Sequence, residues 1–143
     1  MKISTKTRYG LRAMVDLVVN YRGMPVLIKE IARRQNISDK YLEHIMLALK
    51  KAGLVESVSG SGGGYFITRD PATITAFDIV KVLEGSLAPV PCIDSDNICG
   101  RSARCSVSNL WFRVREAMVG ILNSTTLKEL AENKNKREIF YHI

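Results

Sequence analysis

Apolar residues recur every three or four positions through the first half of the chain, a spacing typical of amphipathic helices. The first such segment, residues 4–21, carries its apolar positions on one face: Leu11, Met14, Val15 and Val18. Its polar positions fall on the opposite face: Arg8, Arg12, Asp16 and Asn20. Ser4 or Thr5 can cap the N-terminus, and the helix-breaking stretch 22–25 ends it. We therefore expect a first helix with one buried face and one solvent face.

Two further helices are predicted, joined by a short turn at residues 35–37. One covers residues 27–35, and the other runs from Asp39 to about Ala52, with Ser38 as its N-cap and Gly53 as its stop. The inner face of the second is apolar: Leu42, Ile45, Met46 and Leu49. Its outer face is polar, basic and aromatic: Lys40, Tyr41, Glu43, His44, Lys50 and Lys51. This arrangement is typical of a helix-turn-helix, whose second helix enters the major groove of DNA.

A β-hairpin is predicted directly after these helices. Residues 54–58 and 65–68 are rich in β-forming side chains and flank the glycine-rich stretch 59–64. That stretch matches neither G-x-x-x-x-G-K-[ST] nor a loop feeding a helix N-terminus, so a nucleotide site is not favoured. After a helix-turn-helix it is better interpreted as a wing, whose glycines let the backbone approach the sugar-phosphate chain. The expected contacts come from Ser59, Gly60, Gly62 and Gly63.

The second half of the chain also contains helical patterns. A helix is predicted over residues 75–84, and a linker with two prolines, residues 86–91, follows it. The longest periodic segment runs from Ser106 to about Asn123. It carries one apolar stripe: Val107, Leu110, Trp111, Val114, Met118, Ile121 and Leu122. Because the preceding domain already has a core, we expect this helix to pair with its counterpart in a second copy.

The predicted fold is mostly α with a small β-hairpin: a winged helix-turn-helix domain plus a long C-terminal dimerisation helix. We expect the DNA-binding domain at residues 1–85 and a cysteine-containing loop at residues 86–105. The dimerisation helix and a short terminal helix then occupy residues 106–132, and a frayed tail occupies residues 133–143. A length of 143 residues suits one domain with an appended element.

The charge distribution favours a polyanionic partner. The net charge of +7 comes from residues 1–51, which hold eleven Lys/Arg against four Asp/Glu, while the remainder holds ten of each. A localised basic region is the footprint of phosphate binding, because neutralised phosphates release counterions. A basic surface could also meet an anionic membrane, but the helix-turn-helix pattern favours double-stranded DNA. No run is long enough to span a membrane and residues 1–6 lack a signal-peptide core, so we expect a cytoplasmic protein.

All three cysteines, Cys92, Cys99 and Cys105, lie within the fifteen residues 91–105. Free cysteine usually behaves as a small buried hydrophobe, which gives it no reason to gather in a loop of Asp, Ser, Asn, Gly and Arg. A disulfide would leave one cysteine over and is disfavoured in a reducing cytosol. Three thiolates can hold a soft metal or an iron–sulfur cluster. The spacing is wider than the C-x2-C knuckle of zinc sites, so zinc is less favoured, and accidental clustering is the remaining alternative.

These stretches resemble the Rrf-type winged-helix transcription regulators, in particular their iron–sulfur-cluster-binding, IscR- and NsrR-like branch. The resemblance covers residues 2 to about 132. It is carried, in order, by KTRYGLRAM (6–14), SDKYLE (38–43), KAGLV (51–55), GGGY (62–65), the three cysteines, LW (110–111) and TLKEL (126–130). It implies a homodimer that binds a palindromic operator and senses redox state, iron–sulfur supply or nitric oxide.

The resemblance also implies roles for single residues. The cluster, 2Fe–2S in preference to 4Fe–4S, would be held by Cys92, Cys99 and Cys105. Recognition-helix positions that contact DNA in relatives correspond to Ser38, Lys40, Tyr41 and His44. Glu43 corresponds to a position that tunes which operator class is accepted.

Two departures from the family pattern concern these sites. IscR-like members carry a histidine as fourth ligand where this chain has Ser108, and NsrR-like members use an aspartate of the first helix where it has Arg8. The remaining candidates for a fourth ligand are Asp94, Asp96, Ser108, His142 and a solvent molecule. Ser59 stands where IscR-like wings carry an arginine that enters the minor groove, which leaves this wing its backbone contacts.

Three functional hypotheses follow. In the first, a cluster-bearing regulator changes its grip on DNA when the cluster is lost or oxidised. The second keeps DNA binding but uses thiol oxidation, another ligand or a partner protein, as in CymR-like members, as the signal. The third, an enzyme with a catalytic cysteine, needs a base beside the thiolate, and no His, Glu or Lys lies within the stretch 91–105. We therefore predict neither an enzyme nor a small-molecule substrate.

Overall fold

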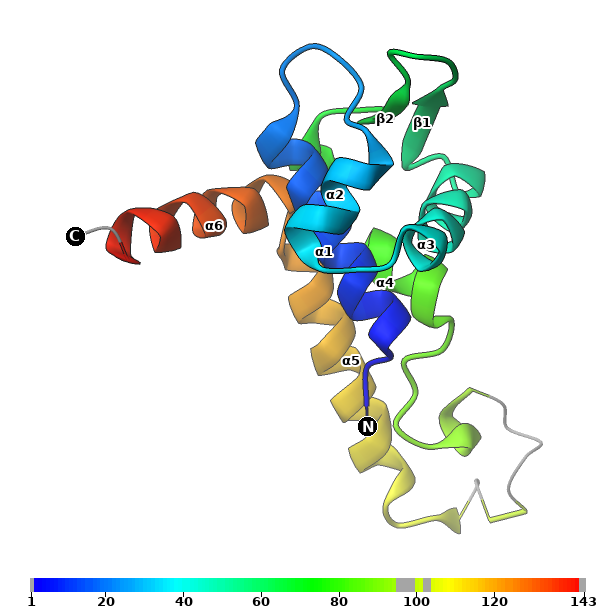
Figure 1. The fold of residues 1–143 in the computed structure, drawn as a ribbon. Coiled ribbons are helices and arrows are strands. Elements are labelled where there is room, and N and C mark those ends of the chain that lie inside the picture. The colour runs from blue at the N-terminus through cyan, green and yellow to red at the C-terminus, as the bar shows by residue number, and fades with distance from the viewer. Residues whose placement is uncertain (1, 95–99, 102–103, 142–143) are drawn as a thin grey trace.

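The computed structural model describes residues 2–94, 100–101 and 104–141, with side chains described as far as Lys134. Six α-helices and two strands follow one another in this part of the chain: α1 (Thr5–Asn20), α2 (Ile28–Gln35), α3 (Asp39–Lys51), β1 (Val55–Val58), β2 (Gly64–Ile67), α4 (Ala76–Glu84), α5 (Ser108–Ser124) and α6 (Leu127–Tyr141). Figure 1 shows α1–α4 and the hairpin gathered into one body. From this body α5 runs down beside the cysteine loop, and α6 extends to one side. The predicted mostly α fold with a small hairpin is confirmed.

The core lies around α1, which packs against α2, α3, α4 and α6. From α3 it receives the four side chains that the sequence predicted, all fully buried: Leu42, Ile45, Met46 and Leu49. From α1 it receives Gly10, Ala13, Met14 and Leu17, whereas Leu11, Val15 and Val18 are only partly buried. The buried face of α1 is therefore rotated from the predicted one, because helices cover α1 on several sides.

Asp16 was predicted to face solvent, but its side chain is fully buried. Its carboxylate accepts hydrogen bonds from Arg34 Nη2 at 2.7 Å, from Arg34 Nε at 3.0 Å and from Gln35 Nε2 at 2.9 Å. The hydrogen bonds from Arg34 to Asp16 raise the pKa of the Arg34 guanidinium. The prediction was wrong because α2 covers this face of α1 and supplies the partners that a buried carboxylate needs.

The start of α1 is fixed to the end of α4 by Glu84. The Glu84 carboxylate accepts from Ser4 N at 3.1 Å, from Ser4 Oγ at 2.8 Å and from the buried Thr7 Oγ1 at 2.5 Å. The Thr7 hydroxyl first, and then the Ser4 groups, hold the pKa of Glu84 below its ordinary value. The linker to the cysteine loop thus leaves the domain from a fixed point, Gly85.

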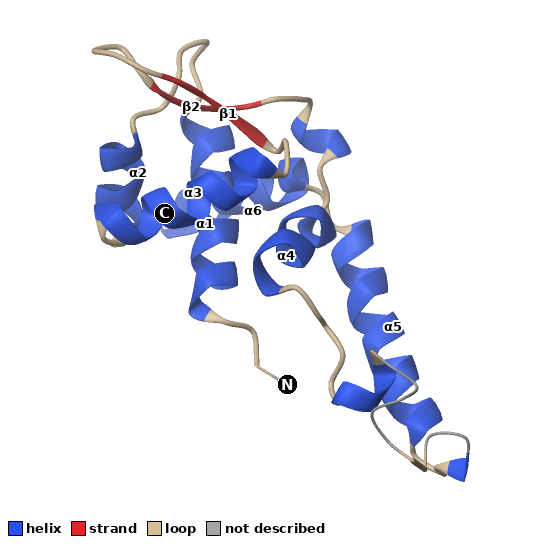
Figure 2. Ribbon diagram, turned by 90° about the vertical axis from the view of Figure 1, so that its right-hand side faces the viewer, coloured by secondary structure: helices blue, strands red, loops and turns tan. Residues whose placement is uncertain are grey.

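The hairpin pairs β1 with β2 in antiparallel register, from Val55 opposite Ile67 to Val58 opposite Gly64. A single bridge between Val26 and Tyr65 adds the segment before α2 to its edge. Figure 2 shows the hairpin lying at one end of the helical body, away from the cysteine loop. This is the arrangement of a winged helix-turn-helix domain.

The last helix, α6, is longer than predicted. It runs to Tyr141, so the frayed tail predicted at residues 133–143 is helical over most of its length. No Gly or Pro follows Thr126, and residues such as Lys, Glu and Arg favour continuation of a helix. At its start, Leu127 N donates to Ile74 O at 2.8 Å, and the Leu127 and Ala131 side chains are buried in the core. The core therefore includes residues that the sequence assigned to the dimerisation segment.

The long predicted helix corresponds to α5, which begins at Ser108 rather than Ser106. It is described throughout, and none of its residues is fully buried. One face is partly covered and includes Trp111 and Met118, while Leu110 and Ile121 are 48% and 67% exposed. None of the helices described is long and apolar enough to cross a membrane.

Candidate nucleic-acid interface and cysteine loop

The recognition helix α3 presents its predicted DNA-binding residues on the outer surface. Its N-cap is Ser38, whose Oγ accepts from Tyr41 N at 3.2 Å. Lys40, Glu43 and His44 are exposed and Tyr41 is partly buried, because the opposite face of α3 is anchored in the core. The structure thus brings these five side chains to one end and one face of a single helix, at its N-terminal half.

Two residues of α1 to which the sequence assigned no contact with this helix, Tyr9 and Arg12, support it. The Tyr9 ring meets the Tyr41 ring edge to face, with centroids 6.0 Å apart. The Arg12 guanidinium lies 5.3 Å from the Tyr9 ring centroid, and its Nε donates to Gln35 Oε1 at 3.1 Å. Gln35 is the last residue of α2, and Tyr41 lies in the first turn of α3. The stack from Arg12 through Tyr9 to Tyr41 therefore holds in place both the loop between α2 and α3 and the start of α3.

The predicted wing contacts differ in how available they are. Ser59, Gly60 and Gly62 are exposed, whereas Gly63 is buried. A Cβ at Gly63 would overlap the Val58 carbonyl oxygen, so the hairpin itself requires glycine there. Nothing lies within 4 Å of a Cβ built on Gly60 or Gly62. Close approach of the wing to DNA therefore stays a prediction, and Gly60 and Gly62 are the glycines best placed for it.

The wing and the recognition helix also touch each other. Lys50 Nζ, near the end of α3, donates to Ser57 Oγ of β1 at 2.6 Å. Burial, and after it the nearby negative charge of Glu43, raises the pKa of Tyr65 in β2. Exposed cations of α2 and α3 lie on the same domain: Lys29, Arg33, Lys40, Lys50 and Lys51. Part of the charge excess seen in the sequence is thus displayed on the surface of the two helices that form the helix-turn-helix.

The cysteine loop is described only in part. Cys92 lies in a short 3-10 turn, Pro91–Ile93, and Cys105 lies just before α5; both are free thiols and half-buried. Cys99 and Asp96, and also His142, fall outside the described residues. Within the described part of the chain no group of three metal-binding side chains is found, so the three-cysteine ligand set stays a prediction.

Both ends of the loop are tied to neighbouring elements. At the first end Ser86 Oγ donates to the Asp94 carboxylate, and Arg115 Nη1 of α5 donates to Ile93 O at 3.4 Å. At the second end Ser108 Oγ donates to Cys105 O at 3.1 Å. Asp94 and Ser108, both candidate fourth ligands, therefore already have local partners. Arg115 lies outside the apolar stripe predicted for this helix, and no spacing rule could reveal its bond to a loop carbonyl.

Comparison with known proteins agrees with the winged helix-turn-helix fold. A family model described as "Rrf2: Iron-dependent Transcriptional regulator" matches residues 3–133. The transcriptional regulator CymR of Bacillus subtilis is 40% identical over 99% of both chains. Its structure, described as that of the global cysteine regulator, matches with a TM-score of 0.77, 41% identity, and coverage of 93% of this chain and 98% of that one.

Two proteins named IscR are also similar. The Escherichia coli regulator IscR is 33% identical over 97% of this chain and 85% of its own length. The solved structure of T. potens IscR matches with a TM-score of 0.76 and 37% identity, covering 94% of this chain and 88% of that one.

The exposed face of α3, the wing beside it and these matches define a winged-helix, DNA-binding transcription regulator. Within that class, the chain belongs to the Rrf2 family of transcriptional regulators. The relatives compared are named as regulators rather than enzymes.

Proposed function

We propose that this regulator acts in the cytoplasm as a homodimer that binds a palindromic operator and senses redox state, iron–sulfur supply or nitric oxide. The sensor would be an iron–sulfur cluster held by Cys92, Cys99 and Cys105. The observation that supports the proposal is that the cysteine loop follows the DNA-binding domain in the chain and is hydrogen-bonded to α5, a helix with exposed apolar side chains.

The dimer is supported by the pattern of that uncovered face. The a and d positions of a heptad, at alternating spacings of three and four, fall on Val107, Leu110, Val114, Ala117 and Ile121. Val107, Leu110 and Ile121 are each between 48% and 67% exposed. Apolar side chains in such a row gain free energy by burial against a second copy. Two-fold symmetry would then place two α3 helices on successive turns of DNA, which matches a palindromic operator.

The donor set fits an iron–sulfur cluster. Cys92 and Cys105 are unpaired thiols that are neither sealed in the core nor fully exposed, and iron in such clusters prefers thiolate ligands. When bound, the cluster would supply oxidisable and removable Fe–S bonds, which make the loop responsive to its surroundings. Asp94 or Ser108 would have to exchange its local hydrogen bond to serve as fourth ligand, so a solvent molecule is a simpler one.

Anaerobic purification tests the proposal. The protein should be brown, contain iron and acid-labile sulfide, and lose both in each of the three Cys→Ala variants. A Ser106→Ala variant is the matched control, because Ser106 is exposed and adjacent to Cys105 without being a thiol. Colourless, iron-free protein with three intact thiols would contradict the cluster.

A cluster-free regulator of the same fold is the second candidate. It is favoured by the 40% identity to CymR, whose structure is described as that of the global cysteine regulator. In this version thiol oxidation, another ligand or a partner protein changes the DNA affinity. Operator binding by iron-free protein, measured before and after addition of peroxide, distinguishes the two candidates. A reversible loss of operator binding that requires the cysteines would favour thiol sensing, and no response would favour the cluster.

A further inference from the structure

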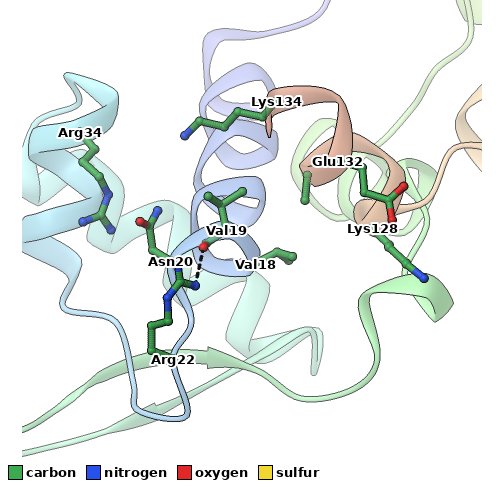
Figure 3. A pocket seen from close by; sticks show the side chains of 9 residues that line it. Val18, Val19, Asn20, Arg22, Arg34, Lys128, Glu132 and Lys134 are labelled. Carbon is green, nitrogen blue, oxygen red and sulfur yellow. Dashed lines mark hydrogen bonds between the residues drawn. The ribbon is translucent and has the colours of Figure 1, made fainter. Parts of the chain in front are cut away.

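A hollow of about 630 Å³ lies between α1, α2 and α6. Figure 3 shows Val18 and Val19 of α1 at its centre, with Arg34 of α2 on one side and side chains of α6 on the other. Among the described residues that line it, none comes from α3, the hairpin or the cysteine loop. Hollows of this size commonly receive small molecules. The hollow is therefore separate from both sites described above.

Four cations line this space, and two of them, Arg22 and Arg34, are held in place. Arg22 Nη1 donates to Val19 O at 2.9 Å and to Tyr21 O at 3.0 Å, which fixes its guanidinium at the end of α1. Arg34 is fixed by its bonds to the buried Asp16. Figure 3 shows Lys134 reaching from α6 across α1, toward the side on which Arg34 and the Asn20 amide lie. Fixed guanidinium groups lose little conformational entropy when they bind a further anion.

The charges around the hollow do not cancel. The four cations that line it are Arg22, Arg34, Lys128 and Lys134. Three carboxylates oppose them: Asp16 and Glu30, which both face Arg34, and Glu132, which lies with Lys128 beyond Val18. An excess of one positive charge remains, on the side of Arg22 and Lys134. A ligand with one negative group would complement it, and the valine surface calls for an apolar portion as well.

We propose that this hollow binds a small organic acid with a single carboxylate. Arg22, Lys134 and the Asn20 amide would hold the carboxylate through charge-assisted hydrogen bonds. A short apolar portion would lie on Val18 and Val19. Because one wall belongs to α6 and the others to the DNA-binding domain, the bound acid bridges the two. The regulator would thus have a second input that does not depend on the cysteines.

Nuclear magnetic resonance of the full-length, isotopically labelled protein tests this site. Butyrate, acetate and inorganic phosphate are titrated separately at an ionic strength held constant with chloride. Butyrate should shift the backbone amides of Asn20, Arg22 and Lys134 saturably, and bind more tightly than acetate because it adds apolar contact. Arg22→Gln and Lys134→Gln should each weaken butyrate binding at least tenfold. Lys81→Gln, on α4 outside the hollow, should leave it unchanged.

Several results would overturn the proposal. These are the absence of saturable shifts, shifts of equal size with chloride, phosphate binding as tight as butyrate, or unchanged binding in Lys134→Gln. A tenfold loss of operator binding in that variant, without any acid binding, would assign these cations to DNA phosphates instead. If Arg22→Gln folds poorly, Lys134→Gln alone decides, since Lys134 lies on α6 beyond the buried Leu127 and Ala131.

Discussion

At the scale of single residues, the sequence predicted the surfaces of α3 well and the polar residues of α1 poorly. Leu42, Ile45 and Met46 fall on one helical stripe and are fully buried. Such apolar side chains can be predicted to be buried without knowing which helix they pack against. Asp16 and Thr7 are buried because particular distant residues, Arg34 and Glu84, satisfy them. Such pairings depend on the packing of whole helices, which periodicity does not encode.

The Glu84 carboxylate is predicted to stabilise the domain in a pH-dependent way. Glu84→Gln should lower the free energy of unfolding by about 1–2 kcal/mol at pH 7, since it weakens hydrogen bonds to a charged acceptor. The folded pKa of Glu84 is depressed, so its contribution is complete above the pKa of the unfolded chain and fades as the pH falls through the lower, folded value. Urea denaturation at pH 7 and pH 3 measures this. An equal difference between the two proteins at both pH values would contradict it.

Alanine substitution at two neighbouring wing glycines, Gly62 and Gly63, is predicted to affect stability differently. Gly63→Ala should destabilise the protein by about 1–3 kcal/mol, because the added Cβ would overlap the Val58 carbonyl oxygen. Gly62→Ala should change stability by less than about 0.5 kcal/mol, since it meets nothing within 4 Å. If the wing approaches DNA closely, Gly62→Ala should nevertheless weaken operator binding. Thermal melts and gel shifts on both variants check this, and the reverse ranking of stabilities would refute it.

At the scale of elements, order and type could be predicted, while the length of α6 and the long-range contacts could not. The cap at Ser38, the stop at Gly53 and the glycine-rich turn place α3 and the hairpin correctly, because these are local signals. The length of α6 escaped prediction, because a polar, Gly-free and Pro-free segment has no stop signal. The tie between α5 and the cysteine loop is a long-range hydrogen bond to a backbone carbonyl, for which a sequence carries no mark.

That tie makes Arg115 a predicted positioning residue for the loop. Arg115→Met keeps the apolar stem but removes the bond to Ile93 O and the stacking on Phe112, whose ring centroid lies 5.2 Å away. The Cys92 thiol of iron-free protein should then react with iodoacetamide several-fold faster, as followed by mass spectrometry. Arg113→Met, at an exposed position of the same helix, is the control. Equal rates in wild type and Arg115→Met would rule the role out.

At the scale of the whole molecule, the proposed dimer accounts for the exposed apolar face of α5. Ile121→Asp should leave the monomer folded, since this side chain is 67% exposed in the single chain, yet weaken dimerisation at least tenfold, or about 1.4 kcal/mol. Asn123→Asp introduces the same charge outside the heptad row and should remain dimeric. Analytical ultracentrifugation separates these outcomes. A fully dimeric Ile121→Asp protein would mean that another surface forms the dimer.

We propose above that a regulator with a winged DNA-binding domain carries an iron–sulfur cluster on the loop that precedes its dimer helix. Native mass spectrometry of anaerobically purified protein tests it most directly, because one spectrum reports both subunits and any bound iron and sulfide. We expect a dimer that carries one cluster on each subunit, and a dimer without added mass for Cys99→Ala. A wild-type dimer with the mass of the polypeptides alone and unmodified cysteines would contradict it.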